Sequence, residues 1–301
     1  MDHIAIIGAG ITGATIFNLL KKKVKLSIFE KSRGVGGRMS TRRAEPYQFN
    51  HGAQYFKIEN TEFKDFLNPL IRNNIIQPWK ANHVEIQNNS IIKRVETKNK
   101  YFAGFPHMNS IVKYLFANNS LVKLSCNINK IQQVMNKWYL IDNNRVYYGP
   151  YDWIIFTIPP NQAKDILPKT FNYLNLIKTI NMRSCFSIML GFKEIKNFNF
   201  DTAFFLDKDI HWFSNNKTYL LKRKYYNLLI NSSYNFAKKN INNSKHKISD
   251  YLLKKASEFL NCELSNYDYK AIHFWRYAML EKINNFGSFV DENSKIIVCG
   301  D

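Results

Sequence analysis

The sequence has few cysteines, and their positions exclude two kinds of site. Cys126, Cys185, Cys262 and Cys299 lie far apart, and no two of them form a C-x-x-C pair. Zinc sites and dithiol centres need closely spaced cysteines, so we expect neither. Each of the four lies in or beside an apolar segment, which is typical of buried free thiols.

Long apolar runs are also missing. No stretch reaches the roughly 20 apolar residues that a membrane-spanning helix needs. The N-terminus passes from Met1 directly into an apolar strand, without the basic region and the small-residue cleavage site of a secretory signal. We therefore expect a cytoplasmic protein with no membrane partner.

Acidic residues are scarce, because 23 Asp and Glu stand against 43 Lys and Arg, which gives a formal charge of +20. Such an excess can indicate a nucleic-acid partner. The lysines, however, are scattered among Asn, Ile, Tyr and Phe, and the only dense basic runs are 21–23 and 222–224. We do not expect a nucleic-acid partner, although the charge would help to attract a phosphate-bearing substrate.

The N-terminal segment carries the first positive signal. Its pattern predicts a strand at His3–Ile7, a helix at Ile11–Lys22 and a second strand at Lys25–Glu30. The turn between the first strand and the helix, Gly8–Gly13, reads GAGITG and satisfies G-x-G-x-x-G. Glu30 follows about 20 residues later, as in a dinucleotide-binding unit.

Each glycine of that motif, and the acid that follows it, has a physical role. Gly8 permits the tight turn, Gly10 lets the backbone approach a pyrophosphate, and Gly13 lets helix and strand pack closely. The helix N-terminus offers free N–H groups to phosphates. Glu30 would accept hydrogen bonds from the hydroxyls of a ribose.

A second glycine loop follows the acid and favours FAD over NAD. Gly34, Gly36 and Gly37 allow another close backbone approach, and Arg38 stands beside them. A plain NAD domain has no need of such a loop, whereas an extended FAD passes its pyrophosphate along one.

The rest of the chain indicates a second, β-rich layer. The apolar run Trp153–Pro160 predicts a strand buried on both faces, ended by two prolines. Beyond this run most segments are predicted to be strands, and one helix is predicted among them at 248–260. The other segments that we expect to be regular are a helix at 110–118 and strands at 121–124, 129–134, 137–141, 184–192, 227–233, 270–278 and 294–301.

Two N-terminal motifs carry a resemblance to a known family. The pattern E-K-x-x-x-x-G-G-R-M begins at Glu30 and resembles the FAD-containing amine-oxidase-like flavoproteins. The fuller GVGGRMSTRR (Gly34–Arg43), together with FNHGAQYF (Phe49–Phe56), is similar to the bacterial renalase-like branch of that group. The likeness extends over nearly the whole chain and includes YFAGFPHMNSIVKYL (Tyr101–Leu115).

The resemblance implies an α/β fold in which a Rossmann-like FAD-binding domain is interleaved with an antiparallel-sheet α+β substrate domain. It places residues 1–60, 101–165 and 279–301 in the FAD-binding domain. Residues 61–100 and 166–278 would form the substrate domain.

It also implies a set of FAD contacts. The pyrophosphate would be held by Gly8, Gly10, Thr12 and Gly13. The adenosine ribose would be held by Glu30 and Lys31, and Arg38 would lie along the phosphates. The remaining contacts would be Gln54 and Tyr55 at the isoalloxazine, Ile128 at the adenine, and Asp301 at the ribityl or pyrophosphate region.

Proteins that are similar in this way oxidise stray dihydro-isomers of NAD(P)H, pass the hydride to flavin, and give hydrogen peroxide with dioxygen. A dihydropyridine expels hydride with its own ring-nitrogen lone pair, so we expect no catalytic base, and no metal. His51 is then a structural histidine. We expect Trp212, Asn216 and Arg276 to bind the substrate, and the protein to be a monomer or weak dimer.

The sequence departs from the family pattern at three places. Asn215 stands where an Arg is expected, and Lys217-Thr218 replaces a Lys-Pro pair. The chain ends at Asp301, where relatives continue into a helix, which leads us to expect a shortened C-terminus.

Three alternatives stay open at this point. A flavin amine oxidase would need an aromatic cage at the flavin, built from Tyr55, Trp212 or Trp275. A non-catalytic remnant would keep the fold but no longer hold FAD. A basic nucleic-acid module is the most distant alternative.

Overall fold

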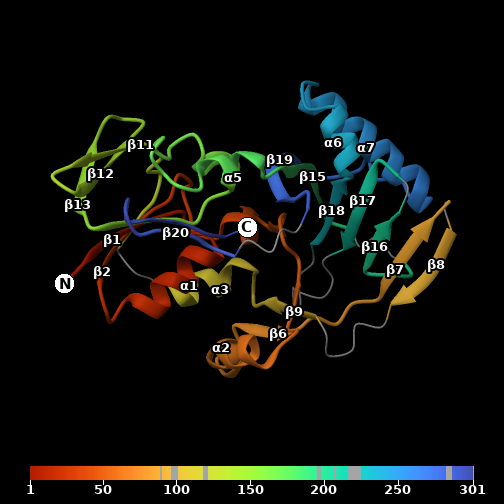
Figure 1. The fold of residues 1–301 in the computed structure, drawn as a ribbon. Coiled ribbons are helices and arrows are strands. Elements are labelled where there is room, and N and C mark those ends of the chain that lie inside the picture. The colour runs from red at the N-terminus through yellow and green to blue at the C-terminus, as the bar shows by residue number, and fades with distance from the viewer. Residues whose placement is uncertain are drawn as a thin grey trace. The chain divides into compact units, whose positions relative to one another are not determined.

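The protein folds into two compact units in the computed structural model (Figure 1). Unit 1 consists of Met1–Ser40, Ile111–Met182 and Met279–Asp301, and unit 2 consists of Thr41–Ser110 and Arg183–Ala278. The structure describes residues 1–88, 90–95, 101–117, 121–194, 198–206, 208–215, 225–282 and 287–300. Each unit has a sheet and a hydrophobic core of its own, so we describe them separately.

Unit 1 is built on a six-stranded sheet with the strand order β10-β2-β1-β14-β21-β20. Its strands are β1 (His3–Ile7), β2 (Lys25–Phe29), β10 (Val122–Lys123), β14 (Trp153–Phe156), β20 (Phe289–Asp291) and β21 (Ile296–Val298). All neighbours pair in parallel except β20 and β21. A separate three-stranded meander consists of β11 (Ile128–Val134), β12 (Lys137–Asp142) and β13 (Tyr147–Tyr151).

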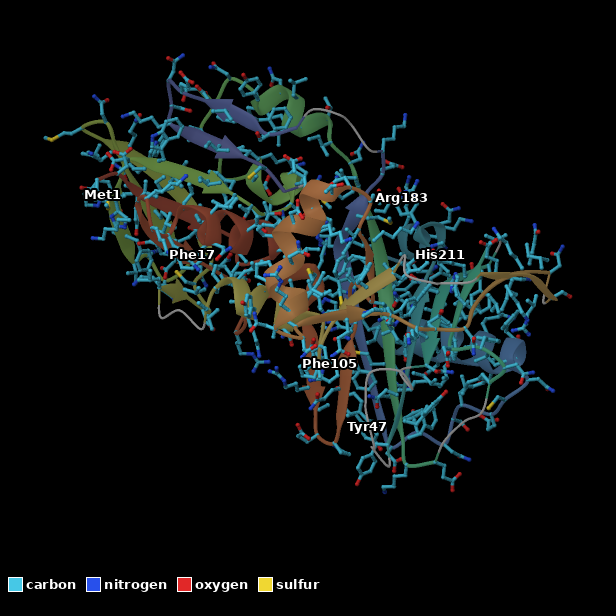
Figure 2. All side chains as sticks on the ribbon, turned by 90° about the horizontal axis from the view of Figure 1, so that it is seen from below. Met1, Phe17, Tyr47, Phe105, Arg183 and His211 are labelled. Atoms are coloured by element: carbon cyan, nitrogen blue, oxygen red, sulfur yellow. The ribbon has the colours of Figure 1, made fainter. Side chains whose placement is uncertain are left out.

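Helices cover the parallel sheet of unit 1. They are α1 (Ile11–Leu20), the 3₁₀-helix η1 (Gly37–Met39), α3 (Asn109–Leu115), α4 (Pro160–Ala163) and α5 (Leu174–Thr179). Phe17 of α1 is buried and lies 5.4 Å, ring centre to ring centre, from Phe116 (Figure 2). Ala5 and Ile7 of β1 belong to a core cluster with Ile177 of α5. Burial on both faces explains why β1 reads as a continuous apolar run.

Unit 2 is built on a seven-stranded sheet with the order β19-β15-β18-β17-β16-β7-β8. The strands of that sheet are β7 (His83–Gln87), β8 (Ser90–Val95), β15 (Met182–Phe192), β16 (Thr202–Phe205), β17 (Ile210–Asn215), β18 (Tyr226–Ser232) and β19 (Tyr269–Leu280). The smaller sheets contain β3 (Thr41–Ala44) with β4 (Tyr47–Asn50), and β5 (Phe56–Lys57) with β6 (Ile76–Pro78) and β9 (Tyr101–Gly104). Its helices are α2 (Thr61–Arg72), α6 (Tyr234–Lys239) and α7 (Lys245–Leu260).

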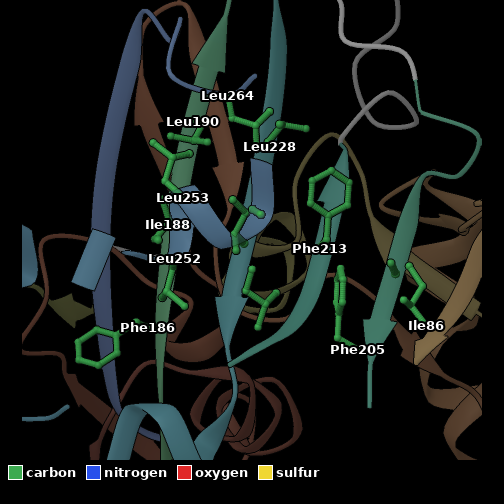
Figure 3. Packing of buried hydrophobic residues seen from close by; sticks show 14 of the residues in the cluster. Ile86, Phe186, Ile188, Leu190, Phe205, Phe213, Leu228, Leu252, Leu253 and Leu264 are labelled. Carbon is green, nitrogen blue, oxygen red and sulfur yellow. The ribbon is translucent and has the colours of Figure 1, made fainter. Parts of the chain in front are cut away.

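The core of unit 2 lies between its large sheet and the helix pair α6–α7 (Figure 1). Leu252 and Leu253 of α7 pack with Phe186 and Ile188 of β15 (Figure 3). Because side chains alternate along a strand, the residues between these core positions face the other side of the sheet. One face of the unit 2 sheet therefore packs against α6 and α7, and the residues between the core positions form the other face.

The structure confirms the predicted α/β architecture with a β-rich second unit. Most predicted elements are present with boundaries shifted by a few residues; α1 ends at Leu20 rather than Lys22, and α7 begins at Lys245 rather than Ile248. The sequence did not reveal α2 or the strands β7, β8 and β16. β16 and β7 pair in parallel, so the expected antiparallel sheet is in fact mixed.

The compact units differ in extent from the two expected domains. The structure groups 41–60 and 101–110 with unit 2, and 166–182 with unit 1. The assignment of a FAD-binding role and a substrate role to these segments stays a prediction. Across the described residues, the helices are too short or too polar for any of them to traverse a lipid bilayer.

Candidate functional site

The glycine turn lies directly after β1, at the carboxyl edge of the parallel sheet. Gly8 has φ +111°, a conformation that favours glycine, and an added Cβ would lie 2.8 Å from Thr157 Oγ1. An added Cβ on Gly13 would lie 2.2 Å from the carbonyl oxygen of Gly8. Both positions therefore require glycine, one for its backbone angle and the other for close packing.

The second glycine loop meets the first one backbone to backbone. The Gly36 N–H donates to the Ala9 carbonyl over 2.9 Å. Gly37 has φ +53°, and a Cβ there would lie 3.2 Å from the Cα of Gly10. No side chain caps α1, whose N-cap is Gly10 itself. The first amides of α1 and its positive dipole end are thus lined by glycine backbone, which suits a phosphate group.

Glu30 is a buried carboxylate that accepts hydrogen bonds from the glycine turn and from the segment after β2. Its exposed fraction is 7%. Oε2 accepts a hydrogen bond from the Ala9 N–H at 2.9 Å, and Oε1 accepts one from the Ser32 N–H at 2.8 Å. An ionised carboxylate has about four lone-pair positions, so Glu30 keeps further accepting capacity for a ribose.

Two residues at the same edge were not singled out in the sequence. The Thr157 hydroxyl, directly after β14, lies 3.0 Å from the Ile7 carbonyl and 2.9 Å from the Gly8 carbonyl, to which it donates. Gly300, after β21, has φ +129°, and its added Cβ would lie 3.5 Å from Thr12 Oγ1. Their only sequence signal is a small residue within two positions of the end of a buried apolar strand.

Four other residues were predicted to contact the cofactor, and they differ in burial and position. Lys31 is exposed, and Arg38 is half-buried in η1. Ile128 begins β11, is buried, and pairs with Asp142 of β12. Asp301 lies outside the described residues.

The predicted flavin-border residues and one predicted substrate residue lie together in unit 2. Gln54 is buried, and its Oε1 accepts a hydrogen bond from Ser214 of β17 over 2.8 Å. The Tyr55 ring stacks on Trp79 at 4.7 Å and lies 5.8 Å from Trp212 of β17. Gln54 and Tyr55 thus lie together against β17, which carries Trp212.

Aromatic rings surround this cluster, and none of its titratable groups changes charge near neutral pH. Trp212 lies 5.5 Å from His83 and 4.7 Å from Phe204, measured between ring centres. Burial raises the pKa of Tyr55 to about 12, with a smaller contribution from Tyr101. Burial also lowers the pKa of His83. Tyr55 is therefore protonated and His83 neutral at pH 7.

His51 belongs to a second aromatic group in unit 2. Its ring lies 4.9 Å from His273 and 5.0 Å from Trp275, whose indole N–H donates to the His51 carbonyl at 3.0 Å. Burial, with the neighbouring His273, lowers the pKa of His51 to about 4. These contacts are those of a neutral, packed imidazole.

The last two predicted substrate residues are not part of the Tyr55 cluster as described. Arg276 of β19 is exposed, and its guanidinium lies 5.6 Å from the Phe274 ring. Phe274 packs on the helix-covered core, and residues two apart share a face, so Arg276 projects to that same face. Asn216 lies outside the described residues.

The cradle in unit 1 fits a dinucleotide. Two glycine loops approach each other at positions that a Cβ would fill, beside an uncapped helix N-terminus and a buried acid. In open α/β sheets, ligands bind at this carboxyl edge, where strand order reverses, and β1 lies at that point between β2 and β14. No group of three residues able to hold a metal ion occurs among the residues that the structure describes.

Comparisons with known proteins agree with this geometry. Residues 6–70 match the NAD(P)-binding Rossmann-like domain family. Mouse renalase is 26% identical over 191 residues, which cover 59% of this chain and 52% of renalase, so the chain spans about half the length of that relative.

Two solved structures show the same fold across nearly all of the chain. An oxidoreductase from Methanosarcina mazei has a TM-score of 0.73 at 13% identity and covers 99% of this chain and 94% of its own. Cyclohexylamine oxidase from Brevibacterium oxydans has a TM-score of 0.68 at 10% identity, covering 92% and 86%. The predicted resemblance is confirmed: the chain is similar to renalase over part of its length, and it has the fold of cyclohexylamine oxidase.

Proposed function

We propose that this renalase-like chain is a FAD-dependent oxidase that takes hydride from dihydropyridine nucleotides and passes the electrons to dioxygen, giving hydrogen peroxide. The observation that supports FAD as the cofactor is the pair of glycine loops in contact at Gly10 and Gly37. This contact lies beside the uncapped N-terminus of α1. A FAD pyrophosphate needs such a stretch of glycine backbone.

The residues of unit 1 would bind the cofactor. Gly8, Gly10, Thr12 and Gly13 would hold the pyrophosphate at the N-terminus of α1. Glu30 would accept a hydrogen bond from a ribose hydroxyl while it keeps its two backbone amides. The remaining cofactor contacts would be Lys31, Arg38, Ile128 and Asp301.

The residues of unit 2 would orient the substrate. When bound, FAD accepts a hydride and passes electrons to dioxygen. Gln54 and Tyr55 would border the isoalloxazine, and Trp212 beside them would fix the orientation of the substrate ring, with Asn216 as a further contact. Arg276 projects to the helix-covered face of the sheet and would not touch that ring. The pKa of Tyr55, about 12, and that of His51, about 4, keep both groups from exchanging protons near pH 7. That suits hydride loss from a dihydropyridine, which releases no proton to a base.

The absorption spectrum of the purified full chain, alone and after addition of FAD, tests the cofactor. We expect flavin absorption bands that stay with the protein through gel filtration. A colourless protein that takes up no added FAD would contradict the proposal and leave the non-catalytic remnant.

Anaerobic mixing tests the substrate. We expect dihydro-isomers of NAD or NADP to bleach the bound flavin, and admission of air to restore the colour with formation of hydrogen peroxide. Putrescine and cyclohexylamine serve as controls and should leave the spectrum unchanged.

A flavin amine oxidase is the second candidate. The Tyr55, Trp79 and Trp212 rings form an aromatic group of the kind that attracts alkylammonium ions, and the fold is that of cyclohexylamine oxidase. Bleaching by an amine, without bleaching by any dihydropyridine, would favour this candidate over the first.

A further inference from the structure

The short connection between β10 and the meander of β11–β13 lies against Glu30. Figure 1 shows the meander, and the connection consists of residues 124–127. The Ser125 N–H donates to the Ser32 carbonyl, and the Cys126 N–H donates to the Glu30 carbonyl, each over 2.9 Å. Whatever holds the 124–127 connection therefore also helps to hold the backbone of Glu30.

The backbone of this connection has an unfavourable conformation that needs support. Ser125 has φ +55°, in the left-handed region that residues with a side chain seldom adopt. Such a conformation persists where the surrounding contacts hold it in place. The connection leads directly into Ile128, the expected adenine contact. Its support therefore also sets the position of Ile128.

Asp142, at the end of β12, provides that support from the side of the meander. It is buried, and it is the register partner of Ile128, beside an irregularity in the pairing between Ile128 and Lys130. Its Oδ2 accepts a hydrogen bond from the Tyr148 hydroxyl over 3.0 Å. The same oxygen lies 3.9 Å from the Cys126 thiol, a weak donor.

The other carboxylate oxygen of Asp142 closes the hairpin between β12 and β13. Oδ1 accepts from the amides of Asn144 and Val146, each at 2.9 Å. The hydrogen bond from the Val146 amide is the largest cause that holds the pKa of Asp142 below its usual value, so this side chain is ionised at pH 7. In the same hairpin, the Asn143 N–H donates to the Asn127 carbonyl over 3.0 Å. One carboxylate thus joins the hairpin to the 124–127 connection.

We propose that Asp142 is a positioning residue for the adenosine half of the cofactor, because it fixes the connection that places Glu30 and Ile128. This inference rests on the proposed function, in which those two residues hold the ribose and the adenine of FAD. Asp142 does not touch the ligand itself. Its effect passes through Cys126 and through the hairpin to the backbone that does.

A positioning role and a merely structural role predict different binding patterns. ADP carries the adenosine and the pyrophosphate, whereas FMN carries the isoalloxazine and the ribityl chain without the adenosine. Loss of a positioning residue weakens FAD and ADP together and leaves FMN unchanged. Loss of a merely structural contact lowers the melting temperature but does not separate the two halves of the cofactor.

Calorimetric titration of FAD, ADP and FMN into the full chain, freed of bound flavin, tests the proposal without turnover. Asp142→Ala leaves the Tyr148 hydroxyl and two hairpin amides without their acceptor. We expect it to weaken FAD and ADP by about tenfold and to change FMN by less than about twofold. Tyr148→Phe removes one of these hydrogen bonds and keeps the ring, so we expect a loss of about threefold for FAD and ADP.

Asp291→Ala is the matched control. Asp291, in β20 of the same unit, is also buried, and its carboxylate also accepts from backbone amides, those of Asn172, Asn293 and Ser294. These hydrogen bonds reach residues 172, 293 and 294 rather than the 124–127 connection. Asp291→Ala should lower the melting temperature as Asp142→Ala does, and should change the affinity for ADP by less than about twofold.

Three results overturn the positioning role. They are equal losses of ADP affinity in Asp142→Ala and Asp291→Ala, an equal loss for FMN and ADP in Asp142→Ala, and an unchanged ADP affinity in Asp142→Ala. If Asp142→Ala does not fold, Tyr148→Phe takes its place in all three comparisons.

The absorption test of the proposed function is independent of these results. If ADP binds with the expected pattern and the chain takes up no FAD, Asp142 positions the adenosine of another ligand and the proposed oxidase fails. If the chain retains FAD and the Asp142 and Asp291 variants behave alike, the oxidase stands and the positioning role fails.

Discussion

Glycines at three places in unit 1 fulfil different physical roles. Gly8 supplies a backbone angle, Gly13 supplies space against the Gly8 carbonyl, and Gly37 lets two loops touch. Gly34 belongs to the same sequence motif, yet an added Cβ there would meet nothing within 4 Å. The motif alone therefore does not say which glycines the structure requires.

That difference gives a prediction at the residue scale. Gly13→Ala forces a Cβ into the Gly8 carbonyl, so we expect a loss of about 1–3 kcal/mol in the free energy of unfolding, as for an overpacked core. Urea unfolding measures it. Gly34→Ala is the control and should change stability by less than about 0.5 kcal/mol. Equal losses in the two variants would contradict the packing argument.

At this scale the sequence predicted the motif positions but not their partners. Glu30 could be named from its distance to Gly10, yet its bonds to the Ala9 and Ser32 amides needed the structure. Thr157 escaped notice because it contacts residues 149 and 150 positions away in the chain. No local pattern encodes such a pairing.

Between elements, the Thr157 hydroxyl joins β14 to the turn after β1. Its one proton lies within hydrogen-bond reach of the carbonyls of Ile7 and Gly8, and β14 and β1 pair in parallel from Ile4 to Ile7. The carboxyl end of β14 thus fixes the position of the glycine turn.

We predict that Thr157→Val lowers both stability and FAD affinity. Valine has the shape of threonine but no hydroxyl, so the Gly8 carbonyl loses this donor, and we expect a loss of about 1–2 kcal/mol. Thr157→Ser keeps the hydroxyl and should retain most of both properties. Urea unfolding and FAD titration measure them. A Val variant that matches the Ser variant would rule out the hydrogen bonds as the cause.

The elements themselves were predictable where their patterns were long and regular. β1, α1 and β2 appear almost as expected, because the apolar runs, the glycine motif and the helical spacing are each recognisable in the sequence. α2 was missed, although Asn60 caps it and Glu62 lies in its first turn, because Pro69 interrupts its pattern. β16 has only four residues, too few to show alternation.

At the scale of the whole molecule, buried histidines couple stability to pH. Burial lowers the pKa of His51 to about 4, and burial also lowers the pKa of His83 and His273. The ordinary pKa is 6.5 in the unfolded chain. Above 6.5 both states are neutral and stability is complete. As the pH falls below 6.5 the unfolded state binds protons first, so stability declines towards pH 4.

We therefore predict an acid-side loss of stability that His51 dominates. A shift from 6.5 to about 4 corresponds to about 3 kcal/mol between those pH values. Urea unfolding between pH 7.5 and about 4.5, where the unfolded histidines titrate, measures the slope. His51→Phe should flatten it. An unchanged slope in His51→Phe would contradict the assignment.

The chain passes between the two units four times, at 40/41, 110/111, 182/183 and 278/279. β21, at residues 296–298, pairs directly with β14 inside the parallel sheet of unit 1. During synthesis, this sheet waits for residues 296–298, whereas every strand of unit 2 has been made by residue 280. The sheet that carries the glycine turn is thus completed after the sheet of unit 2, and an arrested nascent chain that lacks β21 would display unit 2 first.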